Sequence, residues 1–378
     1  MSTEMIKLRL NSVFRVSTIS AMEKSENRIV FLDYLRVISC FLVLLVHSSE
    51  QFYGPTGNLI LSNDHRLWIG LWDGFSRISV PLFMICSAYL LLPMKENQTW
   101  SAFYKRRFIR VVPPMLFFML LYAIYPAIIG SCSWTQSINT IARIPLNFPD
   151  AAGHLWFMYP LLGMYLLIPF ISPWLRTSTA KQERLFIYIW LVTTCIPYLN
   201  RWFGDVWGQC WWNQYDMLYN FAGYPGYFVL AHYIREHISW NKEKRLAIGL
   251  ACTIIGFVLT FASFFVQAVP GTDISVTDLE IGWCFCTLNC VIFTFGVFLL
   301  FTCITKPGRG YRLVRDISEK SYGMYLMHMF FLLSYAPLIS AVLPVWIAIP
   351  AIALSAYLTS YAVTKLISYI PGSKWIIG

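Results

Sequence analysis

Long apolar runs, each about the length of a membrane-spanning helix, recur along the whole chain. A helix that crosses the hydrocarbon core of a bilayer needs roughly 20 mostly apolar residues. Prolines fall at or near most ends of these runs, as expected where helices stop. The pattern predicts an all-α, polytopic membrane protein of about ten transmembrane helices, near residues 31–52, 74–93, 111–130, 154–172, 185–203, 215–234, 246–268, 281–304, 321–339 and 343–366.

The sixth run contains a sequence that disfavours a straight helix. It reads Gly223-Tyr-Pro225-Gly226, and proline and glycine together are a usual cause of kinks. We therefore expect the helix over 215–234 to be broken or bent.

Composition agrees with the pattern of runs. Of the 378 residues 57% are hydrophobic and only 13% are charged, whereas soluble domains carry about 25% charged residues. Residues 1–28 are polar and lack the short apolar core of a cleavable signal. We therefore expect a cytoplasmic N-terminal tail over 1–28 and one integral membrane domain over 29–378.

Positive charges alternate from loop to loop and predict an orientation. Of the 29 Lys and Arg residues, all but four lie in the tail, in the even-numbered loops, in the C-terminal end or near the inner end of the first span. Cytoplasmic loops of membrane proteins carry an excess of these residues. We therefore expect both termini in the cytoplasm. The four exceptions are Arg66, Arg77, Arg143 and Arg201.

Neither the net charge nor the cysteines indicate a further class of ligand. The charge of +10 is explained by cytoplasmic loops, and no basic patch interleaved with stacking aromatics suggests nucleic acid. Most of the ten cysteines lie in apolar runs, and none has zinc-type CxxC spacing. We expect no metal and no nucleic-acid partner.

The first predicted span contains ionisable residues that are costly in a bilayer. Arg36 and His47 are 11 residues apart, which is three turns plus about 20° and a rise of about 16 Å. Both therefore lie on one stripe, which Glu50 roughly shares. Ionisable residues in a span usually face the protein interior and mark a functional path. Alternatively, Arg36 extends to the lipid headgroups and His47 is a structural histidine.

Several sequence segments resemble one known family. "LDYLRVISCFLVLLVH", with a basic residue, ten residues and then histidine, is similar to the opening signature of the acyltransferase family 3 membrane proteins. Further segments resemble its later parts in order, although the family usually has Ser-Gly where this chain has Ser87-Ala88. These segments are "RISVPLFMICSAYLLL", "RRFIRVVPP", "GHLWFMYPLLGMYLLIPF" and "SYGMYLMH".

The resemblance covers about residues 30–370, and the nearest subgroup contains the enterobacterial common antigen O-acetyltransferase. It implies a membrane-bound O-acyltransferase of the bacterial inner membrane. The expected donor is acyl-CoA, usually acetyl-CoA as co-substrate, and the expected acceptor is a hydroxyl of a glycan or lipid-linked glycan at the outer face. Membrane lipids are expected partners, and a homo-oligomer is left open.

Cofactor binding is assigned to arginines on the cytoplasmic side. Arg107 and Arg110 match the family's RxxR, and Arg106 adjoins them. A planar guanidinium binds phosphate in bidentate fashion, so these residues are expected to hold the phosphates of the donor. Arg36 could contribute to the same site. Asp33, one helical turn before Arg36, is expected to pair with it and to fix its position.

His47 is the expected catalytic residue. An imidazole of ordinary pKa, about 6.5, can accept the proton of an attacking hydroxyl and then protonate the departing thiolate. An acyl-imidazole intermediate is the alternative. Glu50 is expected either to orient His47 or to meet the acceptor, and Arg36 is included in the catalytic set.

Four residues are expected to contact the acceptor. Arg77 begins the second span and either stabilises the oxyanion or binds the acceptor. His154 and Trp156 begin the fourth span on the outer side, and Trp156 could equally belong to the interfacial aromatic belt. His328 lies within an apolar span, and its neighbour Tyr325 is expected to give structural support.

A second class of function stays open. A transporter or flippase for a small anion or a lipid-linked sugar could use Arg36, His47 and Arg77 along a path. Such proteins often have internal repeats with broken helices in matched positions. Only one convincing break is visible here.

Overall fold

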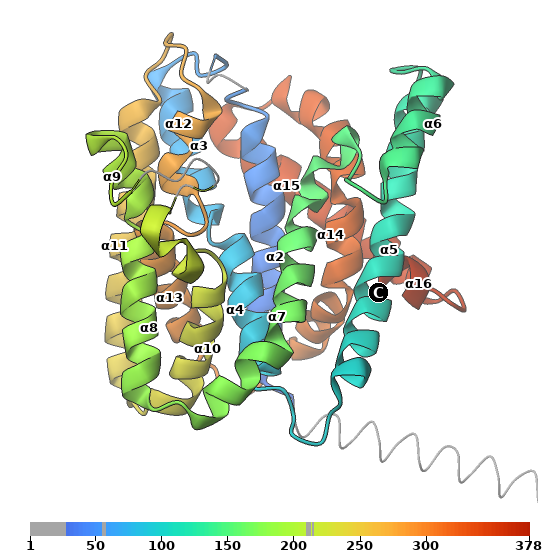
Figure 1. Cartoon of the computed structure of the whole chain (residues 1–378). Coiled ribbons are helices and arrows are strands. Elements are labelled where there is room, and N and C mark those ends of the chain that lie inside the picture. Colours follow the sequence, from blue (N-terminus) through green and yellow to red (C-terminus); the bar gives the residue numbers. More distant parts are fainter. Residues whose placement is uncertain (1–27, 55–57, 209–212, 214) are drawn as a thin grey trace, which may run out of the picture.

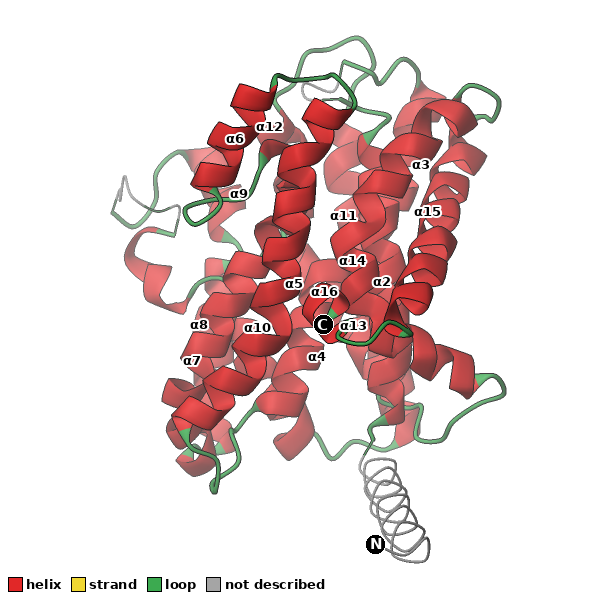
Figure 2. Cartoon of the chain, turned by 90° about the vertical axis from the view of Figure 1, so that its right-hand side faces the viewer, coloured by secondary structure: helices red, strands yellow, loops and turns green. Residues whose placement is uncertain are grey.

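The computed structural model describes residues 28–54, 58–208, 213 and 215–378, and in these residues all regular structure is helical (Figure 1, Figure 2). The predicted tail, apart from Arg28, lies outside the described residues. The elements in chain order are α2 (Val30–Glu50), α3 (Asn63–Ser76), α4 (Ser79–Leu91), α5 (Trp100–Ile128), α6 (Trp134–Arg143), η1 (Asp150–Phe157), α7 (Met158–Thr177), α8 (Ala180–Thr193), α9 (Ile196–Phe203), η2 (Asp216–Phe221), α10 (Pro225–His237), α11 (Lys242–Gln267), α12 (Val276–Leu279), η3 (Ile281–Trp283), α13 (Leu288–Phe301), α14 (Tyr311–Ser340), α15 (Val345–Ser368) and α16 (Lys374–Ile377).

Eight stretches of the described chain are long and apolar enough to cross a membrane, whereas the sequence predicted about ten. They are Val30–Glu50, Asn63–Leu91, Trp100–Ile128, Asp150–Thr177, Lys242–Gln267, Ile281–Phe301, Tyr311–Ser340 and Val345–Ser368. The count of ten and the orientation of the termini stay predictions.

The predicted spans over 185–203 and 215–234 are each divided into shorter helices. Pro197 stands at the start of α9 and Pro225 at the start of α10. A proline has no amide hydrogen, so it fits the first turn of a helix without the loss of a hydrogen bond. The chain therefore begins a new helix at each proline, which confirms the break expected at Gly223-Tyr-Pro225-Gly226.

Helix α2 runs through the middle of the bundle and contacts α3, α4, α14 and α15 (Figure 1). Its serines lie inside the protein, where a polar group needs a partner. Ser48 donates a hydrogen bond of 2.7 Å to the carbonyl of Ile349 on α15. On α15, the Tyr357 hydroxyl donates to the carbonyl of Val37 at 3.2 Å. These bonds fix the position of α2, on which Arg36 and His47 lie.

Helices α11 and α13 pack very closely, and glycine makes this approach possible. A Cβ atom on Gly256 would lie 2.5 Å from the backbone of Phe293, and one on Gly296 would lie 2.5 Å from the amide nitrogen of Thr253. Small residues let helix backbones approach in the same way at many membrane helix interfaces.

Candidate functional site

A cavity with a volume of about 680 Å³ lies between α2, α4, α5, η1, α7 and α14. Its charged lining is mostly cationic, with only Asp33 and Glu319 as carboxylates. A pocket of this size can take a small organic molecule, and the excess of guanidinium groups favours an anionic one. The five lining arginines are Arg28, Arg36, Arg107, Arg110 and Arg315.

Asp33 joins the start of α2 to α14. It is buried and accepts hydrogen bonds from the Tyr311 hydroxyl at 2.6 Å and the Ser318 hydroxyl at 2.7 Å. Arg28 binds both of its oxygens, at 2.6 and 2.8 Å. These hydrogen bonds raise the pKa of Arg28, so the pair stays ionised.

The expected pairing of Asp33 with Arg36 is present, as an ion pair without a hydrogen bond. Arg36 Nη1 lies 3.7 Å from Asp33, which is within ion-pair range but too long for a hydrogen bond. The cation nearest to Asp33 is instead Arg28, at 2.6 Å. Arg36 consequently keeps most of its hydrogen-bonding capacity for another group in the cavity.

The three arginines of the RRFIR segment differ in position. Arg107 and Arg110 line the cavity, and in the described part of the chain no carboxylate pairs with either of them. The Nε atom of Arg107 is buried, and no described residue offers it a hydrogen bond; this arrangement is costly unless a ligand supplies one. Arg106 is exposed and does not line the cavity, contrary to the expectation that all three act together.

A second, smaller cavity, of about 210 Å³, contains the His47–Glu50 pair. The distance from His47 Nδ1 to Glu50 Oε2 is 2.6 Å. Because the carboxylate can only accept, Nδ1 donates, and the lone pair of a neutral imidazole is then on Nε2. This is the arrangement of a general base held in one tautomer by a carboxylate.

Two more buried histidines lie beside His47. The centroid distances are 5.4 Å from His47 to His328, 6.4 Å from His47 to His154 and 4.9 Å between the latter two. His328 Nδ1 lies 2.6 Å from the carbonyl of Tyr325 and therefore donates to it. Nε2 of His328 and Nδ1 of His154 have no partner in the described structure. The cluster thus presents two further unpaired nitrogens near His47.

Arg77 lines the smaller cavity but is already paired with protein groups. It binds Asp73 through Nε at 2.6 Å and Glu280 through Nη1 at 3.2 Å, and it stacks 4.4 Å above the ring of Trp283. Nη2 of Arg77 also donates a hydrogen bond of 3.1 Å to the Tyr53 hydroxyl. Arg77, which was expected to contact the acceptor or the oxyanion, is therefore part of a largely buried ion-pair network.

The two cavities adjoin at Phe157 and Tyr325, which line both of them. The two rings are in edge contact, with centroids 6.2 Å apart. The Tyr325 hydroxyl donates to the carbonyl of His154, so α14 holds η1 in place here. Trp156 lines the smaller cavity and stacks on Phe285, with centroids 5.5 Å apart.

Sequence reasoning missed the partners of Arg77. Asp73 lies four residues before Arg77 on helix α3, and this spacing is a usual signal for an ion pair. Tyr53 and Glu280 carry no such signal, because Glu280 is 203 residues away from Arg77. The fold alone brings them together.

The fold and the site define a polytopic membrane protein in which an arginine-lined cavity adjoins a partly buried histidine–carboxylate pair. Residues 29–365 match the family model described as "Acyltransferase domain". The chain therefore belongs to acyltransferase family 3 and is a membrane acyltransferase.

One curated relative is similar over part of the chain. "Regulator of hypoxia-inducible factor 1" of Caenorhabditis elegans is 22% identical over 232 residues, which are 54% of this chain and 45% of that protein. This chain thus spans less than half of the relative's length. No solved structure matches the chain significantly.

Proposed function

We propose that this protein transfers an acyl group, in the first instance acetyl, from acyl-CoA to a hydroxyl of a glycan or lipid-linked glycan on the other side of the membrane. One observation supports this above all others. The cavity that contains His47 and Glu50 adjoins the arginine-lined cavity, and Phe157 and Tyr325 form part of both walls.

The donor fits the larger cavity through its charge. The phosphates of acyl-CoA would bind the cationic wall, where Arg36, Arg107 and Arg110 have hydrogen-bonding capacity to offer. Along α2, the rise from Arg36 to His47 is about 16 Å. The pantetheine arm is long and thin, so it suits this distance. It would pass between the cavities at Phe157 and Tyr325 and carry the thioester towards His47.

The chemistry is then a direct acyl transfer. The acceptor oxygen attacks the thioester carbonyl while His47 Nε2 takes its proton, a carbon–oxygen bond forms, and the carbon–sulfur bond breaks. The proton passes from His47 to the departing thiolate. Glu50 stabilises the imidazolium that forms in between.

Acceptor binding is assigned to the smaller cavity. Trp156 and His154 line this cavity. Trp156 offers an aromatic face, and Nδ1 of His154, which has no partner among the described residues, can accept a hydrogen bond from a hydroxyl group. His328, which was also expected to contact the acceptor, does not line the cavity, and we assign it to packing against His47.

Arg77 is bound by Asp73 and Glu280. We therefore assign it to shaping this cavity and to holding Glu280 towards the acceptor.

The test uses the purified full-length chain in lipid nanodiscs with radiolabelled acetyl-CoA and a glycolipid fraction as acceptor. His47→Ala should lower the transfer rate roughly 10²- to 10⁴-fold, which is the usual contribution of a general base. His65→Ala is the matched control, because His65 lies on α3 outside both cavities, and its rate should not change.

The donor site has its own test. Arg107→Ala and Arg110→Ala should raise KM for acetyl-CoA, with a smaller effect on kcat, because the two arginines would bind the phosphates.

Full activity in His47→Ala would refute the assignment of the base. Acyl-CoA binding without any transfer would instead favour the transporter alternative.

A further inference from the structure

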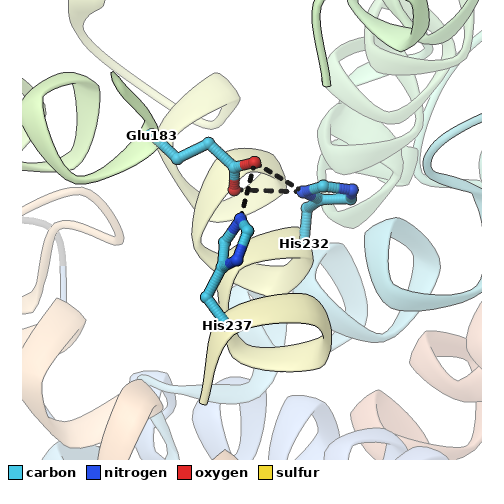
Figure 3. Close-up of side chains that lie close together, drawn as sticks. All are labelled: Glu183, His232 and His237. Atoms are coloured by element: carbon cyan, nitrogen blue, oxygen red, sulfur yellow. Dashed lines mark hydrogen bonds and ion pairs between the residues drawn. The ribbon is translucent and has the colours of Figure 1, made fainter. Parts of the chain in front are cut away.

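A second group of ionisable side chains lies outside both cavities, where α8 begins and α10 ends. Figure 3 shows the imidazoles of His232 and His237 pointing at the carboxylate of Glu183. His232 Nδ1 is 3.0 and 3.1 Å from the two carboxylate oxygens, and His237 Nε2 is 3.1 Å from Oε1. All three potential ligand atoms lie within 4.8 Å of one another.

The local structure holds these groups in place. The capping box of Thr179 and Gln182 fixes the first turn of α8, and Ser178 donates a hydrogen bond of 2.7 Å to Glu183. His232 and His237 are five residues apart, so a regular helix would point them about 140° apart. They converge because His232 uses the nitrogen nearer its backbone and His237, the last residue of α10, uses the farther one.

The distances between the histidine nitrogens and the Glu183 oxygens are close to those between ligand atoms around one small cation. Tetrahedral zinc with bonds of about 2.0–2.2 Å to His and Glu places its ligand atoms roughly 3.3–3.5 Å apart. The nitrogen–oxygen distances here are only a few tenths of an ångström shorter. Moreover, one N–H of His232 cannot point at both carboxylate oxygens, since hydrogen bonds prefer a nearly linear angle. A metal ion can contact Glu183 and both imidazoles together.

We propose that Glu183, His232 and His237 bind one divalent transition-metal ion of the zinc type, with Ser178 orienting the carboxylate. Two imidazoles and one carboxylate form a ligand set that zinc takes in proteins. A hydroxyl that bonds to a ligating carboxylate is a usual outer partner of such sites. The ion would join α8 to α10. This proposal departs from the sequence-based expectation of no metal, and it does not depend on the acyl transfer.

The first experiment measures metal binding by the full-length protein itself. The purified chain is stripped with a chelator and titrated with Co²⁺ and then with Zn²⁺. We expect one Co²⁺ per chain with the visible absorption of a tetrahedral site, and displacement of that absorption by Zn²⁺. Zn²⁺ should also raise Tm, because a ligand that binds only the folded state stabilises it.

Variants then locate the site. His237→Ala is the best first choice, because this side chain is 23% exposed and ends its helix. It should abolish the Co²⁺ absorption and the rise in Tm with Zn²⁺. Ser178→Ala should weaken Co²⁺ binding about tenfold, since outer partners contribute roughly 10- to 100-fold. His65→Ala is the control and should bind Co²⁺ like the wild type.

The same measurements can overturn the proposal. If the wild-type chain takes up no Co²⁺ or Zn²⁺ and its Tm is the same with metal and with chelator, the three residues form a hydrogen-bonded cluster only. Metal binding that persists unchanged in His237→Ala would place the ion elsewhere and would equally refute the site. Neither result bears on the acyl transfer, which is measured separately.

Discussion

Single residues show how strongly a buried charge depends on its partners. Asp33 is 1% exposed and accepts hydrogen bonds from Arg28, Tyr311 and Ser318. Glu50 has one short bond, to His47, and is partly open to the smaller cavity. The first carboxylate therefore stabilises the fold, and the second is available for the chemistry proposed above.

Removing the charge of Asp33 should destabilise the protein. Asp33→Asn leaves Arg28 without its main partner, and breaking a buried pair costs roughly 3–5 kcal/mol. Because Arg28 is 24% exposed and water compensates part of this loss, we expect about 2 kcal/mol. The measurement is Tm in detergent. The matched control is Glu319→Gln, whose side chain is 47% exposed and which should cost less than about 1 kcal/mol. Equal losses in the two variants would contradict the prediction.

Removing the charge of Glu50 should affect the rate rather than the stability. Glu50→Gln takes away the carboxylate that fixes the tautomer of His47, and the acyl-transfer rate should fall roughly 10²- to 10⁴-fold. Glu50→Asp keeps the charge and should recover part of the rate. An unchanged rate in Glu50→Gln, with Tm like the wild type, would show that Glu50 does not act through His47.

At the scale of elements, the helices differ in what limits their approach. Helices α11 and α13 approach closely because each has a glycine at their contact, Gly256 on α11 and Gly296 on α13. Helix α2 is instead held by hydrogen bonds from serine and tyrosine to neighbouring backbone carbonyls. The first interface depends on the absence of a side chain, so it is sensitive to even one added methyl group.

A pair of alanine substitutions tests this difference. Gly256→Ala would place a Cβ 2.5 Å from the Phe293 backbone and should cost about 1–3 kcal/mol through overpacking. In α7, a Cβ on Gly163 meets no atom within 4 Å. Gly163→Ala should therefore be neutral or stabilising by up to about 1 kcal/mol, because alanine is the better helix former. Tm values measured side by side decide, and a loss of stability in Gly163→Ala alone would reverse the interpretation.

At the scale of the whole molecule, the positions of the two cavities suggest from which side of the membrane the donor would enter. The arginine-lined cavity and the histidine-containing cavity lie on either side of Phe157 and Tyr325. The distribution of Lys and Arg among the loops predicts that the arginine-lined side faces the cytoplasm. Acyl-CoA is made in the cytoplasm, so this orientation is required by the proposed reaction.

The orientation can be measured with reporter fusions in a bacterial host. A green fluorescent protein fused after Gly378 should fluoresce, because it folds in the cytoplasm. An alkaline phosphatase fused at the same place should be inactive, because it needs the oxidising outer side. An active phosphatase would place the C-terminus outside and would reverse the predicted direction.

The sequence by itself determined the all-helical membrane class, the family and the stripe of Arg36, His47 and Glu50. These follow from hydrophobic length, motif order and helix periodicity, which are local properties of the chain. Two of the ten predicted spans are divided at prolines into helices shorter than a span, so the count of ten stays a prediction. Only the tertiary structure decided which distant charges meet: Glu280 with Arg77, two histidines with Glu183, and Arg28 beside Arg36 at Asp33. Contacts between distant segments depend on how the helices pack, and no short pattern in the chain records that packing.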